Sequence, residues 1–137
     1  MHRPLFIKWQ NVNSTGIPII DEQHRGILSI INSLYYLTNK RICDDELCSF
    51  ISDAIKDYAR VHFITEEGIL QAAAYPDLEK HREKHVIFAL EAEQMEHAGI
   101  RANDTKPLLN FLKTWWLEHI NKDDMLYVPF VRKDKDS

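Results

Sequence analysis

The stretch HFITEEGILQAAAYPDLEKHREKH, residues 62–85, decides the fold because it repeats polar side chains at helical spacing on both sides of a break. His62 is followed four residues later by Glu66, and His81 is followed four residues later by His85. Side chains four residues apart share one face of an α-helix. Between the pairs, the segment AYPD at 74–77 interrupts the pattern, and proline suits the first turn of a new helix. The stretch therefore predicts two helices, each with a polar pair on one face.

Apolar residues at the same spacing extend this pattern over the chain and predict four helices. The first is expected to run from an N-cap at Asp21 to about residue 39, and the second from an N-cap at Asp44 to the AYPD segment. The third is expected to begin near Pro76 and to end at a loop over 97–107, where Thr105 caps the fourth. The residues expected to face the interior are Ile27, Leu28, Ile31, Leu34, Tyr35, Leu47, Phe50, Ile51, Ala54, Ile55, Tyr58, Leu78, Phe88, Ala92, Met95, Leu108, Leu112, Trp115 and Trp116.

Each of these helices has one apolar stripe, which it can bury only against the other helices. The sequence therefore predicts an all-α fold, an antiparallel up-down-up-down four-helix bundle. A length of 137 residues suits one domain, and only 4 glycines and 5 prolines favour long helices over a loop-rich β fold. We expect residues 1–137 to form this single domain, with 1–18 as an extended N-terminal arm and 128–137 as a solvated C-terminal tail.

Composition and charge exclude several classes of partner. A net charge of −4 gives no basic face for nucleic acid, and no apolar run reaches the roughly 20 residues that span a bilayer. The first residues contain no apolar segment of the kind that signal peptides carry, which predicts a cytoplasmic protein. Cys43 and Cys48 match no zinc-binding pattern, and we expect them to be reduced thiols rather than a disulfide.

Polar residues continue the apolar stripes of all four helices at steps of three and four. They are His24 on the first, His62 and Glu66 on the second, His81 and His85 on the third, and His119 on the fourth. Taken singly, these residues also suit a hydrogen-bonded core histidine, a solvated histidine pair or an intrahelical hydrogen bond. Taken together, they predict one shared partner, a metal, because burying so many polar groups is otherwise costly.

The number of candidate ligands indicates how many metal ions the site holds. Five imidazoles exceed the three that one catalytic metal normally takes from a protein. Five imidazoles with two carboxylates fit two metals that the carboxylates bridge. Neutral imidazole and carboxylate suit iron, zinc or copper, and the pattern lacks the thiolates of a structural zinc site.

Four separated motifs in this chain resemble, in order, those of the bacterial hemerythrin family. Trp9, Gly16 and IDEQH at 20–24 resemble its N-terminal signature, and HFITEE at 62–67 resembles its His-x-x-x-Glu segment. YPDLEKHREKH at 75–85 resembles its His-x-x-x-His segment with the preceding Tyr-Pro, and HINKDDMLY at 119–127 its terminal segment. The resemblance covers almost the whole chain.

The resemblance implies a non-haem di-iron centre that binds O₂ reversibly, with an oxo or hydroxo group between the two iron ions. It implies that one iron is held by three histidines and the other by two, and that the second keeps an open position for O₂. Glu66 and Asp124 would bridge the irons. The implied ligands are His81, His85 and His119 for the first iron, and His24 and His62 for the second.

Two residues depart from a simple fit to the family pattern. Asp123 follows His119 by four residues and would share its face on an ideal helix, whereas the motif selects Asp124, five residues on. We therefore expect a π-type bulge there, a feature common at functional sites. Trp116 occupies a position where relatives usually carry leucine. It is expected to face the metal pocket and to alter the lifetime of bound O₂, or alternatively to serve only in core packing.

The function that the resemblance implies is O₂ storage, transport or scavenging by a protein that is not an enzyme. Enzymes that activate O₂ in helical bundles use carboxylate-rich sites with Glu-x-x-His motifs, which this chain lacks. One alternative is an oxygen- or redox-sensing domain that signals to a partner protein. A third reading is a di-iron enzyme that handles peroxide or nitric oxide. The expected partner is dioxygen, with no nucleic acid and no membrane.

Overall fold

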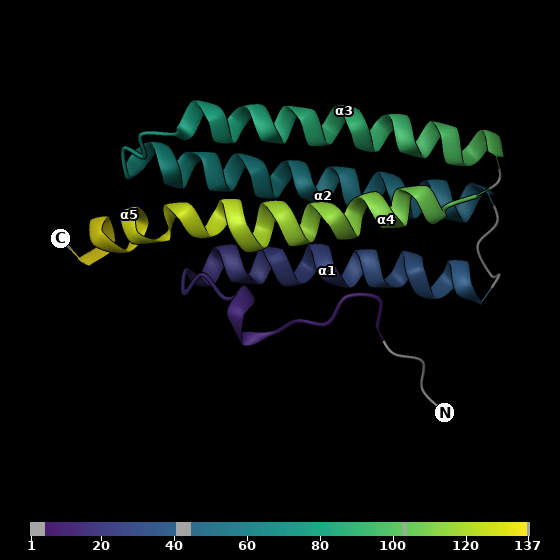
Figure 1. The fold of residues 1–137 in the computed structure, drawn as a ribbon, viewed down its shortest axis with the longest axis horizontal. Coiled ribbons are helices and arrows are strands. Elements are labelled where there is room, and N and C mark those ends of the chain that lie inside the picture. The colour runs from purple at the N-terminus through teal and green to yellow at the C-terminus, as the bar shows by residue number, and fades with distance from the viewer. Residues whose placement is uncertain (1–4, 41–44, 103, 137) are drawn as a thin grey trace.

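The computed structural model describes residues 5–40, 45–102 and 104–136, and four long helical rods run through it side by side (Figure 1). The first three rods are α1 (Pro18–Asn39), α2 (Asp45–Ala72) and α3 (Leu78–Ala102). The fourth is continuous in space but changes character along its length, from α4 (Lys106–Trp115) through the π-helical segment η2 (Trp116–Asp123) to α5 (Asp124–Asp136). Successive rods run in opposite directions, which confirms the predicted antiparallel four-helix bundle.

Three helix ends differ from the prediction. Helix α1 begins at Pro18, so Asp21 lies in its first turn and is not its N-cap. Helix α3 continues into the expected loop as far as Ala102, and Gly99 in this last part of the helix lets the following chain approach closely. The segment 128–136, expected as a solvated tail, continues helix α5, and Val131 in it is buried. The other predicted cap, Asp44, lies outside the described residues.

Of the 22 buried apolar residues in the described part of the chain, 11 are residues that were predicted to face the interior. Two of these predictions are wrong, since Phe50 is 72% exposed and Met95 is 36% exposed. Phe50 points outward because the inward positions at the start of α2 belong to Cys48 and Ser52, both buried. The residues confirmed as buried are Ile27, Leu28, Ile31, Leu34, Ile55, Phe88, Ala92, Leu108, Leu112, Trp115 and Trp116.

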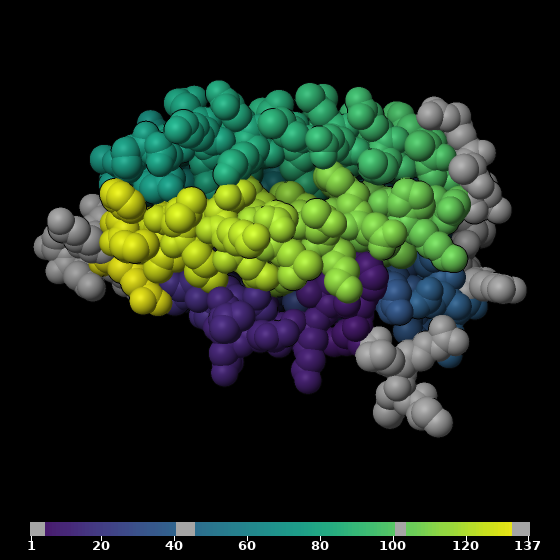
Figure 2. All heavy atoms as spheres, in the orientation of Figure 1, coloured from purple at the N-terminus to yellow at the C-terminus, as the bar shows by residue number. Residues whose placement is uncertain are grey.

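The N-terminal arm packs against the bundle. The side chain of Asn32 in α1 accepts from the backbone N–H of Ile7 at 2.9 Å and donates to its carbonyl at 2.8 Å. The ring of Phe6 stacks on Tyr35, with centroids 4.5 Å apart. Trp9 meets Trp116 of η2 edge-on at 6.2 Å. Figure 2 shows the arm and the start of α1, both purple, lying along the lower edge of the fourth helix.

The start of α1 is fixed by the carboxylate of Asp21. Its Oδ1 accepts from the backbone N–H and the hydroxyl of Thr15, at 2.7 Å each, and its Oδ2 accepts from the hydroxyl of Ser14 at 2.7 Å. The backbone N–H of Gly16, whose φ of 76° is left-handed, also donates to Oδ2 at 3.2 Å. Burial raises the pKa of Asp21, but these hydrogen bonds outweigh it and the pKa is lowered.

The cysteine prediction is wrong for the residue that the structure describes. Cys48 is disulfide-bonded, whereas the sequence predicted a reduced thiol. Cys43, the other cysteine of the chain, lies outside the described residues.

Within residues 5–40, 45–102 and 104–136, no helix is long and apolar enough to cross a membrane.

Candidate metal centre

The four rods bring seven polar side chains together in the interior of the bundle. Each of the seven is at most 4% exposed. They come from α1, α2, α3, the π-helical segment η2 and the first residue of α5. These are the seven residues singled out as metal ligands in the sequence: His24, His62, Glu66, His81, His85, His119 and Asp124.

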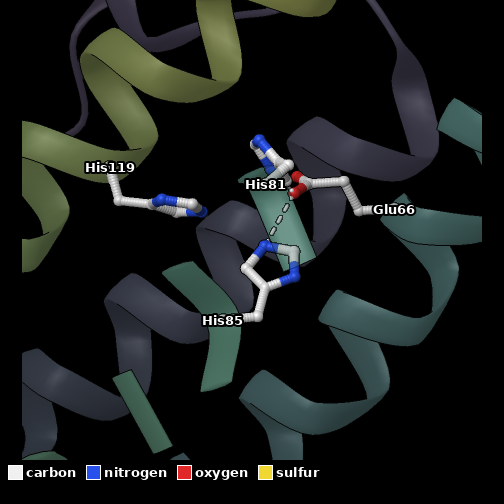
Figure 3. Close-up of side chains that lie close together, drawn as sticks. All are labelled: Glu66, His81, His85 and His119. Atoms are coloured by element: carbon white, nitrogen blue, oxygen red, sulfur yellow. Dashed lines mark hydrogen bonds and ion pairs between the residues drawn. The ribbon is translucent and has the colours of Figure 1, made fainter. Parts of the chain in front are cut away.

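Three histidines face one side of the two carboxylates. The Nε2 atom of His85 lies 3.1 Å from Oε1 of Glu66, and Nε2 of His81 contacts the same oxygen. Oδ1 of Asp124 lies 3.1 Å from Nε2 of His81 and 3.2 Å from Nε2 of His119. Figure 3 shows the three rings and the Glu66 carboxylate approaching one another from three different helical rods. We call His81, His85 and His119 the three-histidine group.

Two histidines face the other side. The Nε2 atoms of His24 and His62 lie 3.1 Å apart. Oε2 of Glu66 lies 3.2 Å from Nε2 of His62, and Oδ2 of Asp124 lies 3.1 Å from Nε2 of His24. We call His24 and His62 the two-histidine group.

Each of the two carboxylates therefore directs one oxygen to the three-histidine group and the other oxygen to the two-histidine group. Glu66 presents Oε1 to the three-histidine group and Oε2 to the two-histidine group, and Asp124 divides Oδ1 and Oδ2 in the same way. All five histidines present Nε2 to this space, the same nitrogen in each case. This arrangement suits two cations side by side, each facing one group of histidines and sharing both carboxylates.

Polar atoms left unpaired in the interior support the fit to metal. Nε2 of His119 and both carboxylate oxygens of Asp124 are buried and have no hydrogen-bond partner among the described residues. They lie at ion-pair distances from neighbouring groups but without hydrogen-bond alignment. Leaving such groups unpaired is costly, and a coordinated cation satisfies them together. Imidazole nitrogen with carboxylate oxygen is a donor set that suits iron.

The protonation of the cluster follows from its crowded charges. Burial raises the pKa of Glu66, but hydrogen bonds from His62, His81 and His85 outweigh it and hold the pKa well below its usual value. Burial lowers the pKa of His81, but its contacts with Asp124 and Glu66 outweigh it and raise the pKa to about 9. Without metal, the protonated imidazole of His81 therefore offsets part of the negative charge of the two carboxylates, and a metal ion must displace its proton.

The π-helical segment decides which aspartate enters the cluster. The backbone N–H of Asp124 donates to the carbonyl of His119, five residues earlier, instead of the residue four earlier. This wider turn places Asp124 on the inner face with His119, and Asp124 is fully buried. The predicted bulge is therefore present, and the ideal-helix alternative, Asp123, faces outward.

Asp123 instead supports His119 from outside. Its Oδ2 lies 3.3 Å from Nδ1 of His119, and its Oδ1 lies 2.8 Å from Nζ of Lys84. The contact with His119 is the main reason that the pKa of Asp123 falls to about 2; burial opposes the fall and Lys84 adds to it. Asp123 is thus an ionised neighbour of the cluster.

Further residues orient the histidines and Glu66, and no role was predicted for them from the sequence. Nδ1 of His62 donates to Oε1 of Gln23 at 2.7 Å, and Nδ1 of His85 donates to Oε2 of Glu67 at 2.8 Å. The hydroxyl of Tyr127 donates to Oε2 of Glu66 at 3.0 Å. Gln23 and Glu67 directly adjoin the cluster residues His24 and Glu66 in the chain, and that adjacency within the motifs was the available signal.

Trp116 lies beside the two-histidine group. It is 1% exposed, and its ring meets that of His24 edge-on, with centroids 6.1 Å apart. The neighbouring Trp115 lies on the other side, nearly parallel to the ring of His119 at 5.6 Å. The two tryptophans therefore contact histidines of different groups.

Comparisons with known proteins agree with this geometry. The family model described as the hemerythrin HHE cation binding domain matches residues 15–131. A bacteriohemerythrin from Clostridium acetobutylicum is 32% identical over 126 residues, which cover 88% of this chain and 97% of the relative. A bacteriohemerythrin from Stenotrophomonas maltophilia is 30% identical over 129 residues, covering 90% and 80%.

Solved structures are similar in fold. A wild-type hemerythrin crystal structure matches with a TM-score of 0.78 at 24% identity, covering 92% of this chain and 98% of that one. The matched family model spans most of the chain, and the seven buried residues lie within the matched region. The chain therefore belongs to the hemerythrin family.

Proposed function

We propose that the seven buried residues hold the two iron ions at which this hemerythrin binds O₂ reversibly. His81, His85 and His119 would hold one iron, His24 and His62 would hold the other, and the two carboxylates would bridge them. The observation that carries this assignment is that Glu66 and Asp124 each present one oxygen to each histidine group.

The unequal number of histidines supports the place of O₂ binding. With both carboxylates shared, the iron of the two-histidine group has one protein ligand fewer than the other. An open position on a metal is what admits a small ligand, so we place O₂ on the side of His24 and His62. When bound, the two ferrous irons supply the electrons that hold O₂ in the site.

The chain's own residues would hold this position and keep it dry. Trp116 covers the edge of His24, and Trp9 packs on the outer side of Trp116, beneath the guanidinium of Arg25 at 4.6 Å. The hydroxyl of Tyr127 fixes the Glu66 oxygen that faces the two-histidine group. Excluding water from such a site limits proton leakage and the loss of bound O₂.

Carriage or storage of O₂, rather than turnover, suits this site. The part of the chain that the structure describes places no nucleophile or free acid–base pair in the cluster beyond the proposed ligands, their hydrogen-bond partners and the two tryptophans. The donor set is also rich in imidazole, unlike the carboxylate-rich sites of O₂-activating bundles. We therefore propose that the protein is not an enzyme.

A cytoplasmic location belongs to the same proposal, and the disulfide at Cys48 counts against it. Alkylating the thiols of cells that produce the protein, followed by mass analysis of the cysteine peptides, shows whether Cys48 is a free thiol or disulfide-bonded in the cell. Alkylated Cys48 supports the cytoplasm; protected Cys48 contradicts it.

Reconstitution with ferrous iron without air, followed by exposure to air, tests the proposed function. We expect two irons per chain, a visible absorption band that appears with O₂, and its loss when O₂ is removed by argon. A protein that binds no iron, or whose spectrum never reverts under argon, would overturn the assignment.

A further inference from the structure

The outer nitrogens of the histidines meet different partners in the two groups. In the three-histidine group, Nδ1 of His85 donates to the carboxylate of Glu67 at 2.8 Å, and Nδ1 of His119 lies at an ion-pair distance of 3.3 Å from the carboxylate of Asp123, without hydrogen-bond alignment. Two of the three histidines thus face a negative charge on their outer side, and both carboxylates are about three-quarters buried, at 24% exposure.

The two-histidine group has neutral outer partners. Nδ1 of His62 donates to the side-chain carbonyl of Gln23 at 2.7 Å. The amide nitrogen of Gln23 donates to the hydroxyl of Thr65 at 3.2 Å, which fixes the carbonyl toward His62. Nδ1 of His24 is buried and has no hydrogen-bond partner in the described part of the chain.

Cations from α3 hold the two outer carboxylates in place. Nε of Arg82 lies 3.1 Å from Oε1 of Glu67, leaving Oε2 to face His85. Nζ of Lys84 lies 2.8 Å from Oδ1 of Asp123, leaving Oδ2 to face His119. Both cations stand between His81 and His85 in the sequence, so one helix supplies two ligands and both clamps.

We propose that Glu67 and Asp123 are positioning residues that make the iron of the three-histidine group the easier of the two to oxidise. This inference rests on the proposed function and deepens it, because it assigns an order to the two irons. Each oxidation takes one electron from a ferrous ion and leaves a ferric ion; in the working protein the electron goes to bound O₂.

The physical reason lies in how an outer partner changes an imidazole ligand. An imidazole that donates Nδ1–H to a carboxylate becomes more basic at Nε2 than one that donates to an amide. Charge-assisted hydrogen bonds are also stronger than neutral ones. A more basic ligand beside a negative charge favours the ferric ion over the ferrous ion, so the reduction potential of that iron falls.

Electrochemical titration of the iron-loaded protein tests this order, because it resolves the two one-electron steps. Glu67→Gln keeps the size and hydrogen-bonding reach of the side chain but removes its charge. The step at lower reduction potential, called the lower step, would belong to the iron of the three-histidine group, and the upper step to the other iron. We expect Glu67→Gln to raise the reduction potential of the lower step by more than that of the upper step. Gln23→Glu places a charge on the other group and should lower the upper step by more than the lower step. Equal shifts of both steps, or no shift in either variant, would overturn the proposal.

Arg82→Gln separates an electrostatic role from a merely structural one. Removing the guanidinium leaves the negative charge of Glu67 less compensated. We therefore expect the reduction potential of the lower step to fall, opposite in sign to the effect of Glu67→Gln. A role limited to holding His85 in place predicts the same sign in both variants, since each loosens that ring. If Glu67→Gln loses iron, Arg82→Gln decides alone: a fall in the lower step supports the proposal, and a rise or no change overturns it.

Glu79→Gln is the matched control. Glu79 is an exposed partner of Arg82 and contacts no histidine of the cluster, so its loss should shift neither step measurably. A shift as large as that of Glu67→Gln would show that any nearby charge suffices and would overturn the proposal. Iron content keeps the two claims apart, because wild-type protein without two irons contradicts the proposed function, whereas two irons with unordered steps contradict only this inference.

Discussion

Asp123 and Asp124 are neighbours in the chain but face opposite sides of His119. Asp124 is fully buried with Oδ1 3.2 Å from Nε2 of His119, whereas Asp123 is 24% exposed with Oδ2 3.3 Å from Nδ1 of the same ring. One imidazole is therefore held between two consecutive carboxylates. The π-helical segment makes this possible, because it turns the residue five positions after His119 toward the inner face.

This relationship predicts different effects of removing the two carboxylates. Asp124→Ala removes a proposed bridge and should reduce the iron content to one ion per chain or fewer. Asp123→Ala leaves every proposed ligand in place and should retain two. Iron analysis after gel filtration of both reconstituted variants measures this, and loss of iron only in Asp123→Ala would contradict the assignment.

Iron binding should release protons. Burial lowers the pKa of His81, but contacts with Asp124 and Glu66 outweigh it and raise the pKa to about 9 in the metal-free protein. His81 is therefore protonated at pH 7. At any pH below about 9, its bound proton competes with iron and favours the metal-free state. Since iron needs the neutral ring, affinity should rise by up to about tenfold per pH unit between pH 7 and 8 for each proton displaced.

Calorimetry of ferrous iron binding in two buffers of different ionisation enthalpy counts these protons. Equal heats in both buffers would contradict the expected release. His81→Gln, which has no titratable ring, provides the comparison, and it should release fewer protons per iron that it still binds.

Asp21 should stabilise the fold above its own titration and not below it. Its folded-state pKa is lowered, because hydrogen bonds from Thr15, Ser14 and Gly16 outweigh burial. A lowered pKa contributes stability above the unfolded value of about 3.9, and this contribution is lost as pH falls through the folded value. Asp21→Asn should therefore cost about 1–2 kcal/mol at pH 7, discounted for partial exposure, and much less near pH 3.

Urea denaturation of the wild type and Asp21→Asn at pH 7 and pH 3 measures the difference. Asp77→Asn is the control, because no hydrogen bond or ion pair to its carboxylate is found among the described residues, and its cost should be small at both pH values. A cost for Asp21→Asn that is the same at both pH values would show that its charge is not what fixes the start of α1.

Trp116 should govern how long O₂ stays bound. Its indole packs against His24 on the side where we place O₂, and leucine would leave space for water there. We expect Trp116→Leu to autoxidise about tenfold faster, which corresponds to about 1.4 kcal/mol in the barrier. Stopped-flow absorbance measures the rate of O₂ dissociation, and slow absorbance changes in air measure the rate of autoxidation.

Trp115→Leu is the comparison for this effect. It also removes an indole, but one that stacks on His119 in the three-histidine group. Similar acceleration in both variants would indicate general loosening of the core, and unchanged rates in Trp116→Leu would leave Trp116 with core packing alone.

Helical spacing was sufficient to predict the four rods and six of the seven converging side chains, because it places residues on faces without knowledge of the partners. The seventh, Asp124, came from the family resemblance. Periodicity alone favoured Asp123, which lies outside the buried cluster, since a bond spanning five residues does not follow the regular helical period. The family motif corrected it. Phe50 was misplaced because apolar character does not reveal which face of α2 turns inward near its start.

The end of α3 and the outer partners were not predictable in the same way. Gly99 falls in the loop expected over 97–107, but it lies within α3, and a Cβ there would lie 2.8 Å from the carbonyl oxygen of Asp104, so glycine serves the close return of the chain. The sequence predicted no role for Arg82 and Lys84. Their roles depend on where Glu67 and Asp123 lie, and those residues come from other helices.

We propose that two irons lie side by side between the two histidine groups and share Glu66 and Asp124. A crystal of the iron-loaded protein, with anomalous scattering recorded at the iron absorption edge, tests it most directly. We expect two peaks inside the bundle, one facing His81, His85 and His119 and the other facing His24 and His62. A single peak, or peaks outside this cluster, would contradict it.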